Sequence, residues 1–593
     1  MKIYINFFKT LLFCFTFISV TGNVCIAGPD DELNQIFADR VEYNLRTYPE
    51  GATYDGDHRY DDMLSDNSEA ANIEYYDSAR AYIARLKSID YNSLSESNKL
   101  NYDLFLSSLE EDLEGEKFNW YLMPLGQQSG IHIGAPQIVN VQPVTTYEEY
   151  QKYFSRLRQL ESKFNNTIDN MRKGMSQGYV MPVFLMDQTL PQMENIMNKE
   201  IEKSIFYSVV EKDNKMSDEE MELAKKELKE IIATVINPSY QKLYDFVKNE
   251  YLPVCRIDAG IWAVPNGKER YEYSIKSYTT LDLTADEIHN IGLSEVSRIS
   301  AEMERVKDET GFKGTLSEFN DFLKTDTQFY FTDKEDLLKG YRDILTNMDA
   351  KLPELFGTLP EADYDLFEME EYRAASAPQA YYYSAPEDRS RPGLFYVNTF
   401  NLPSRPKYTM TALALHEAVP GHHLQISIAQ ELKGLPKFRR DYSVTAFVEG
   451  WGLYAESLGY ETEMYEDLYQ LYGALTFEIW RACRLVVDTG IHDKKWTREE
   501  AFEFMKKYTP NSDHDIQTEI DRYISWNGQA LAYKIGELKI KELRKTAETR
   551  LGENFNVKDF HDQVLKNGAI PLPLLEKIID EWIESQLIKN ELN

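Results

Sequence analysis

Cysteine is scarce in this chain, which has 4 Cys among 593 residues. Two of the four, Cys14 and Cys25, lie within the first 27 residues, so the rest of the chain contains only Cys255 and Cys483. Small secreted scaffolds that depend on disulfides carry many more cysteines for their length. The sequence therefore excludes a disulfide-stapled scaffold, and the stability of the protein must come from packing.

Positive charge is also in short supply. The chain has 65 Lys and Arg residues against 98 Asp and Glu residues, which gives a formal net charge of −33. Nucleic acids and anionic membrane surfaces are repelled by a chain that is acidic over most of its surface. We therefore expect no nucleic-acid partner.

Long apolar runs are missing after the N-terminus, so the mature chain is expected to have no transmembrane segment, which needs roughly 20 apolar residues. At the N-terminus, Lys2 and Lys9 precede a short apolar run over residues 11–20. This order is typical of a secretory signal. We predict a signal peptide over residues 1–27, with cleavage after Gly22 or Ala27 or lipid attachment at Cys25, and hence an exported periplasmic or cell-surface protein.

Apolar and aromatic residues are abundant, with 42% hydrophobic residues, 40 Tyr and 29 Phe, as in a globular protein. Apolar residues recur at helical spacing in several segments. These segments are residues 68–86, 95–113, 146–175, 218–250 and 285–306, and the chain after Tyr408 has the same character almost to its end. Residues 30–66, rich in Asp, are expected to wrap the surface as a polar segment, and residues 122–143 to form loops or short strands beside a cleft.

Strands are expected in one region, residues 380–383 and 393–398, where aromatic and β-branched residues lie between Pro386, Pro392 and Pro403. The fold class is therefore mainly α, with a small β element. The body of the chain, residues 28–593, is expected to divide into an N-terminal helical lobe at about 28–280 and a catalytic lobe at about 281–593. Two hypotheses for the strand over residues 395–398 stay open. It could be an edge strand that binds an extended peptide, with Asn398 as a contact, or part of a sheet without a ligand role.

The residues with the clearest chemistry begin where an apolar helix over residues 408–415 ends, at His416-Glu417-Ala418-Val419-Pro420-Gly421-His422-His423. Zinc peptidases of the zincin type place two His one helical turn apart, so that both imidazoles reach one zinc ion while the intervening Glu faces its water. Pro420 occupies the position of the second His in that spacing. The second ligand is therefore His422 or His423.

Helix geometry favours neither His without a distortion. At about 100° per residue, His422 would point some 240° away from His416, and His423 would share its face about 10.5 Å further along. Pro420 cannot donate to the helix ladder and clashes with the carbonyl of His416, so a bulge or kink is expected there. Such a distortion can bring His422 to the metal, with His423 as an outer contact.

A third ligand is expected from a neighbouring helix. Residues 443–456 form an apolar segment on which Glu449 and Glu456 lie two turns apart on one face. Burying both carboxylates without a cation would be costly. Glu449 is the predicted ligand, since Gly450 next to it allows helices to approach closely, and Glu456 is predicted to orient a ligand from behind.

These motifs resemble those of a known family. His-Glu-x-x-Pro-Gly-His-His-x-Gln at 416–425 and Glu-Gly-Trp-x-Leu-Tyr-x-Glu at 449–456, with further matches at 481–492 and 528–536, are similar to the bacterial "domain of unknown function 885" family. Its members resemble helical zinc peptidases. The resemblance covers most of the mature chain and implies a large helical zincin-like fold with a deep active-site cleft and one zinc ion (Zn²⁺) per chain. Asn527 departs from the pattern, where Pro is expected.

Roles follow from the chemistry of zinc hydrolases. Zinc held by His416, His422 and Glu449 keeps an open position for water, and Glu417 would accept the proton of that water and deliver it to the leaving amine. The oxyanion needs a donor, for which His492, Tyr533 and Arg522 are candidates, with Asp488 one turn before His492 to hold its ring. Arg481 and Arg484 are expected to bind buried carboxylates or the carboxylate of a peptide.

The sequence therefore predicts a zinc-dependent hydrolase of peptide bonds, acting on short peptides. Two alternatives stay open: a metal-dependent hydrolase of another amide or ester, and a binding protein whose zinc is structural. The sequence leaves the oligomeric state open.

Overall fold

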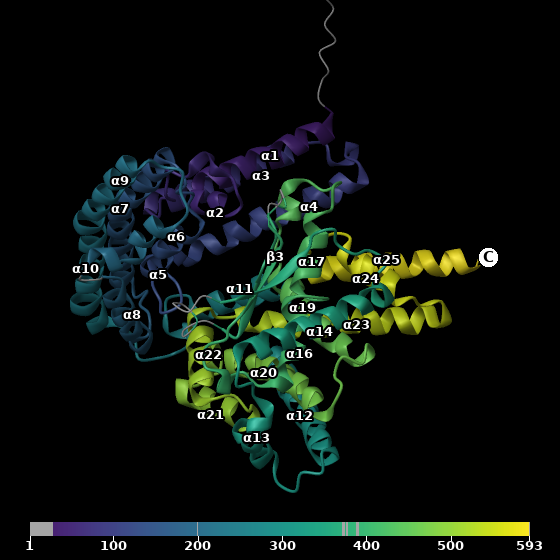
Figure 1. Ribbon diagram of the computed structural model, residues 1–593. Coiled ribbons are helices and arrows are strands. Elements are labelled where there is room, and N and C mark those ends of the chain that lie inside the picture. Colours follow the sequence, from purple (N-terminus) through teal and green to yellow (C-terminus); the bar gives the residue numbers. More distant parts are fainter. Residues whose placement is uncertain are drawn as a thin grey trace, which may run out of the picture.

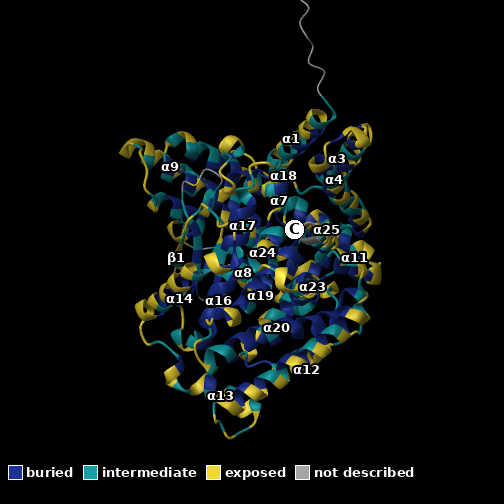
Figure 2. Ribbon diagram, turned by 90° about the vertical axis from the view of Figure 1, so that its right-hand side faces the viewer, coloured by how far each residue is buried: buried dark blue, intermediate teal, exposed yellow. Residues whose placement is uncertain are grey.

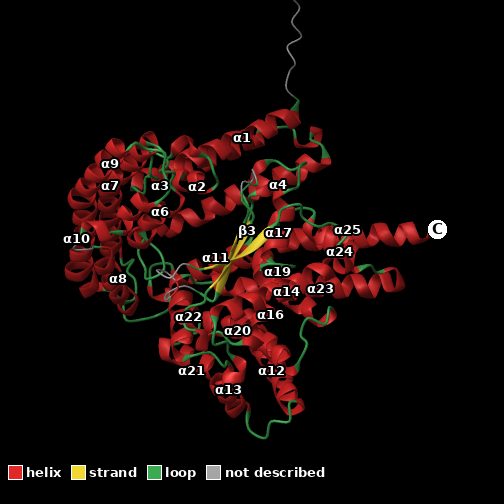
Figure 3. Cartoon of the chain, viewed as in Figure 1, coloured by secondary structure: helices red, strands yellow, loops and turns green. Residues whose placement is uncertain are grey.

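The computed structural model describes residues 28–197, 200–369, 374, 378–386, 389 and 391–591. The predicted signal peptide and Cys25 lie outside these residues. Within them the chain is mainly helical, and the three strands form one small sheet near the centre of the molecule (Figure 3). The predicted fold class, mainly α with a small β element, is confirmed.

The first helices form a group with a core of its own. This group contains α1 (Pro29–Thr47), α3 (Glu69–Lys87) and α4 (Glu96–Gly115), joined by the short α2 (Pro49–Tyr54). The prediction of a polar surface segment over residues 30–66 is wrong for α1, which buries Leu33, Ile36 and Phe37. These three apolar residues recur at helical spacing among acidic ones and suffice to seat the helix on its neighbours.

A second group of helices lies at the left of Figure 1. It consists of α7 (Tyr147–Gln177), α8 (Val183–Ile196), α9 (Asp218–Ile231) and α10 (Asn237–Phe246). Capping boxes start α7 and α9, with the Thr146 and Ser217 hydroxyls each accepting from the third helical N–H. Short helices α5 (Ile131–Gly134) and α6 (Ile138–Val141) occupy the segment for which loops or short strands were expected.

The sheet has the order β1-β3-β2, with β1 (Tyr364–Glu368), β2 (Ala380–Tyr383) and β3 (Gly393–Val397). Strand β3 pairs in parallel with β1 and antiparallel with β2. The two strands expected from the sequence are present, and β1 was not expected. The hypothesis that residues 395–398 bind a peptide by edge addition is wrong, because β3 is the central strand and both of its edges are already paired.

Two pairs of closely packed helices lie in the part of the chain after residue 284. Helix α12 (Ala285–Glu309) packs along α20 (Leu468–His492), and α19 (Thr445–Glu461) packs along α23 (Ala532–Leu551). Almost every residue of α20 from Tyr472 onward is buried, as its apolar sequence on all sides requires, and Figure 2 shows it dark blue. A Cβ added at Gly450 would lie 2.5 Å from the Cα of Gly536, so α19 and α23 touch backbone to backbone, as expected for Gly450.

Further helices complete the fold. They are α11 (Gly267–Thr279), α13 (Leu316–Thr325), α14 (Lys334–Leu355), α16 (Met410–Glu417), α17 (His422–Gln430), α18 (Lys437–Arg440), α21 (Arg498–Tyr508), α22 (Asp513–Ser525), α24 (Val557–Leu565) and α25 (Leu572–Glu591). Each of the two large apolar cores draws residues from both sides of position 280, and the division into two lobes stays a prediction. Among the described residues, no helix is long and apolar enough to cross a membrane.

Candidate metal centre

A short loop interrupts the helix between His416 and His422. Helix α16 ends at Glu417, the Val419–Pro420 peptide bond is cis, and α17 begins at His422. The indole N–H of Trp451, on α19, donates to the Pro420 carbonyl at 2.8 Å and holds this loop against the core. The distortion expected at Pro420 is therefore a full interruption of the helix, which turns His422 back toward His416.

Three side chains meet at this break, and they are the predicted ligands His416, His422 and Glu449. Their ligand atoms lie within 4.8 Å of one another. The Nε2 atoms of His416 and His422 lie 3.5 and 3.6 Å from Oε2 of Glu449. Tetrahedral zinc with bonds of about 2.0–2.1 Å requires ligand atoms about 3.3–3.5 Å apart. The donor set and the two distances to Glu449 therefore fit zinc.

His423 faces elsewhere. Its Nδ1 lies 2.8 Å from the Tyr382 hydroxyl and 3.3 Å from that of Ser427, and its ring packs on Tyr364 at 4.5 Å between centroids. The structure thus places His422 with the other ligand atoms, and places His423 against the sheet.

Behind His416 lies the predicted supporting carboxylate. Oε1 of Glu456 is 2.8 Å from Nδ1 of His416 and 3.4 Å from a guanidinium nitrogen of Arg481. A carboxylate at Nδ1 leaves Nε2 free to bind a metal and raises the basicity of the ring. Gly452 makes room for this ring, because a Cβ there would lie 2.6 Å from Cε1 of His416.

Burial and close charges shift the pKa values of the cluster strongly. Burial raises the pKa of Glu417 to about 7 and lowers that of His422 to about 4. Burial opposes the other two shifts, but hydrogen bonds to Glu449 and Glu456 raise the pKa of His416 to about 9, and the contact with His416 lowers that of Glu449 to about 2. Glu449 is therefore ionised, and its carboxylate attracts positive charge to this cluster.

Tyr533, on α23, lies near Glu449 and contributes to the lowered pKa of that carboxylate, and its hydroxyl accepts from the Gln529 amide at 3.5 Å. The guanidinium of Arg484 stacks 4.5 Å from the centre of the Tyr533 ring. Glu519, which sequence reasoning missed, accepts hydrogen bonds from Arg484 at 3.1 Å and from Arg522 at 2.9 Å. Nη1 of Arg484 is buried and, among the described residues, has no hydrogen-bond partner.

His492 lies among structural contacts. Its Nδ1 accepts from the Ile261 N–H, and its Nε2 bonds to the Tyr523 carbonyl, each at 3.0 Å. Burial lowers the pKa of His492 to about 3, so the ring is neutral. With both ring nitrogens in use, His492 has no N–H to offer a substrate, which argues against the predicted catalytic role.

Asp488 and Asn398 are also engaged with the fold. Asp488 accepts from the Tyr271 hydroxyl at 2.6 Å and from the Gly528 N–H at 3.1 Å, so it does not hold the His492 ring as the helical spacing suggested. Asn398 is fully buried, and its amide donates to the carbonyls of Ala374 and Pro378. These contacts argue against a substrate-binding role for Asn398.

Two residues important for the cluster were missed, although the motif contains both. Trp451 and Gly452 follow Glu449 directly, and each contacts the segment that carries the two His ligands. An aromatic donor and a glycine directly after the predicted ligand Glu449 are the signal that could have identified them.

The sequence family described as bacterial protein of unknown function (DUF885) matches residues 49–579. The chain belongs to this family. No curated protein matches this DUF885 protein. The resemblance drawn from the motifs is thus confirmed.

Two solved structures share the fold. A candidate lipoprotein from Colwellia psychrerythraea has a TM-score of 0.89 and 28% sequence identity, over 94% of this chain and 100% of the other. A candidate lipoprotein of unknown function from Shewanella oneidensis has a TM-score of 0.73 and 18% identity, over 92% of this chain and 99% of the other. The fold of this DUF885 protein therefore recurs over nearly the whole length of both.

Proposed function

We propose that this DUF885 protein is a zinc-dependent peptidase that hydrolyses short peptides. The observation that carries the proposal is the convergence of His416, His422 and Glu449 at zinc-ligand spacing, with Glu417 adjacent to the first ligand. Glu456 supports His416 from behind, as outer carboxylates do in zinc enzymes.

The side chains around the ligands have distinct roles. Zinc, when bound, supplies Lewis acidity and lowers the pKa of a water molecule. Glu417, next to the first ligand, would accept a proton from a water molecule and pass it to the leaving amine. The Tyr533 hydroxyl, beside Glu449, donates to the oxyanion that develops at the carbonyl.

Arg484 is the proposed anchor for a carboxylate of the substrate. Its Nη1 is buried without a partner among the described residues, although its Nε donates to the Tyr523 hydroxyl. Glu519 is shared between Arg484 and Arg522, so one carboxylate faces two guanidinium groups. A peptide carboxylate would balance this excess of positive charge and bond the free N–H.

Export is part of the proposal. Residues 1–27 have the pattern of a secretory signal, and both solved relatives are described as candidate lipoproteins. We propose that the mature chain is periplasmic or on the cell surface, and lipid attachment at Cys25 is the narrower form of this proposal.

The test uses the chain from residue 28 onward, purified and loaded with zinc. A defined peptide library, with free and amidated C-termini and with ester analogues, is digested with and without 1,10-phenanthroline, and the products are identified by mass spectrometry. We expect chelator-sensitive cleavage of peptide bonds, with free carboxylates preferred. Cleavage that ignores the chelator, or no cleavage by the loaded protein, would contradict the proposal, and ester products alone would favour another hydrolase.

A matched pair of variants separates catalysis from a structural zinc site. Glu417→Gln should retain zinc and lower turnover by about 10²–10⁴-fold. Glu461→Gln is the control on α19, where Glu461 pairs with Arg544 at the surface. A structural site would leave the function of Glu417→Gln unchanged, and that result would reject the role of Glu417.

A further inference from the structure

A cavity of about 950 Å³ lies between the sheet and the N-terminal helices. Its wall comes from α2, α5, α6 and α7 on one side and from β2 and β3 on the other. The apolar part of the wall includes Leu64, Ile131, Ile138, Val141, Leu160 and Leu394. None of the three ligand residues borders the cavity, so it is a separate compartment from the metal centre.

The sheet separates the two compartments because successive strand residues point to opposite faces. On β2, Tyr382 contacts His423, while the next residue, Tyr383, lines the cavity and packs on Tyr54 at 5.9 Å between ring centroids. On β3, Phe395 packs on Tyr341 in the core, and its neighbours Leu394 and Tyr396 line the cavity.

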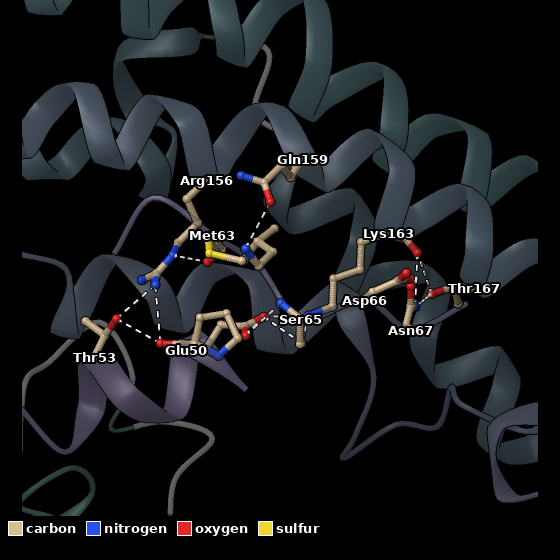
Figure 4. A network of polar contacts seen from close by, with 12 residues as sticks. Glu50, Thr53, Met63, Ser65, Asp66, Asn67, Arg156, Gln159, Lys163 and Thr167 are labelled. Carbon is tan, nitrogen blue, oxygen red and sulfur yellow. Dashed lines mark hydrogen bonds and ion pairs between the residues drawn. The ribbon is translucent and has the colours of Figure 1, made fainter. Parts of the chain in front are cut away.

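One cation at the cavity wall is neutralised. Figure 4 shows Lys163 and Ser65 gathered around Glu50, and Nζ of Lys163 lies 2.5 Å from the Glu50 carboxylate. Although burial opposes it, Lys163 lowers the pKa of Glu50, so the pair is ionised. Arg156, also drawn there, is fully buried and donates to neutral oxygens, among them the Met63 carbonyl and the Thr53 hydroxyl.

Two further cations at the wall have no carboxylate partner within 4 Å among the described residues. Lys212 donates to the Val139 carbonyl at 2.5 Å, and burial lowers its pKa. Arg391 donates to the carbonyls of Ser384 and Pro392 at 2.9 and 3.1 Å. Cations without a counter-charge beside an apolar space are unusual in a chain with a net charge of −33, because partial burial of a charge is costly unless it is compensated.

We propose that this cavity binds a small molecule with an apolar body and a single carboxylate or similar anionic group, which one of the two cations Lys212 and Arg391 receives. Its volume is within the range of small-molecule sites, which are mostly apolar with a few placed polar groups. The anion supplies the missing counter-charge, and the apolar body fills the space beside Tyr54, Tyr383 and Tyr396. The proposal is independent of the peptidase activity.

Two fluorescent probes that differ in charge test it on the chain from residue 28 onward. The first is 8-anilinonaphthalene-1-sulfonate, and the second is N-phenyl-1-naphthylamine, which has the same rings without the sulfonate. We expect saturable binding of both and displacement of both by dodecanoate. The double variant Lys212→Gln, Arg391→Gln should weaken binding of the sulfonate probe on the order of tenfold and leave the uncharged probe unchanged.

Gly134→Leu tests the location. A Cβ at Gly134, which lines the cavity, meets nothing within 4 Å, so a leucine there takes up space and should weaken both probes. Lys225→Gln, at a lysine paired with Glu222 on α9, is the matched control. Thermal unfolding is used to check that each variant is folded. If the double variant is not folded, the two single variants Lys212→Gln and Arg391→Gln replace it. Equal loss of both probes in the folded cation variant, or no loss in Gly134→Leu, would overturn the proposal.

Discussion

The two faces of the small sheet border very different environments. On the face of Tyr382 lies His423, which is next in sequence to His422 of the candidate metal centre, where His416, Glu449 and Glu456 are linked by contacts of 2.8–3.5 Å. On the face of Tyr383 lies a cavity of about 950 Å³ with a largely apolar wall, at which Lys212 and Arg391 have no carboxylate partner among the described residues.

The difference concerns what each environment is built from. The candidate metal centre is formed by side chains of α16, α17 and α19, where close packing around buried residues fixes each side chain. The cavity is formed where the N-terminal helices α2, α5, α6 and α7 meet the sheet. The candidate metal centre and the cavity are thus formed by different parts of the chain. Substitutions at one should therefore leave the other unchanged.

The largest effect should come from replacing His422. His422→Ala removes one of three ligand atoms, and we expect the purified variant to lose stoichiometric zinc by metal analysis. His423→Ala is the matched comparison and should keep its zinc, because that ring contacts Tyr382 and Tyr364. Zinc retained by the first variant, or lost by the second, would show that the metal is not bound as this geometry implies.

A smaller effect on zinc binding is expected from Glu456, which supports the ligand His416. Glu456→Gln leaves the three ligand atoms in place but weakens the support of His416, and we expect zinc affinity to fall by about 10–100-fold in a competition assay with a chelating dye. Glu461→Gln, on the same helix, should leave the affinity unchanged. An unchanged affinity in Glu456→Gln would mean that the carboxylate only pairs with Arg481.

The loop between the two His helices gives a stability prediction. Trp451→Phe keeps an aromatic ring in the core but removes the N–H that donates to the buried Pro420 carbonyl. We expect the free energy of unfolding to fall by about 1–3 kcal/mol in urea titrations. Trp526→Phe, at an indole that is 40% exposed, is the control and should change it little.

The smallest effect on zinc binding is expected from a substitution in the cavity, which tests whether the cavity and the candidate metal centre are independent. Gly134→Leu fills space on the cavity side of the sheet, and we expect its zinc content and zinc affinity to match those of the unchanged chain. A measurable loss of zinc in this variant would show that the two compartments are coupled through the sheet.

Local patterns in the sequence predicted much of the fold. Segments with helical periodicity became α3, α4, α7, α9 and α12, and the aromatic runs became β2 and β3. Strand β1 escaped notice because Asp365 and Glu368 interrupt its apolar pattern, and pairing with β3 is what makes the segment a strand.

The candidate site could also be predicted in part. The residues that converge could be named, because a metal demands particular ligand types at limited spacing. His492 was misjudged because a buried His with structural partners has the same sequence signal as a catalytic one. The cavity was beyond reach, because residues near positions 50, 135 and 395 become neighbours only in the folded chain.

The pleat of β2 has a consequence for strand alignment. Since consecutive tyrosines point in opposite directions, a shift of β2 by one residue against β3 would exchange their sides. The Tyr382 hydroxyl would leave His423, and Tyr383 would leave Tyr54, in a single step. Contacts on both faces of the sheet therefore fix the register of this strand of only four residues.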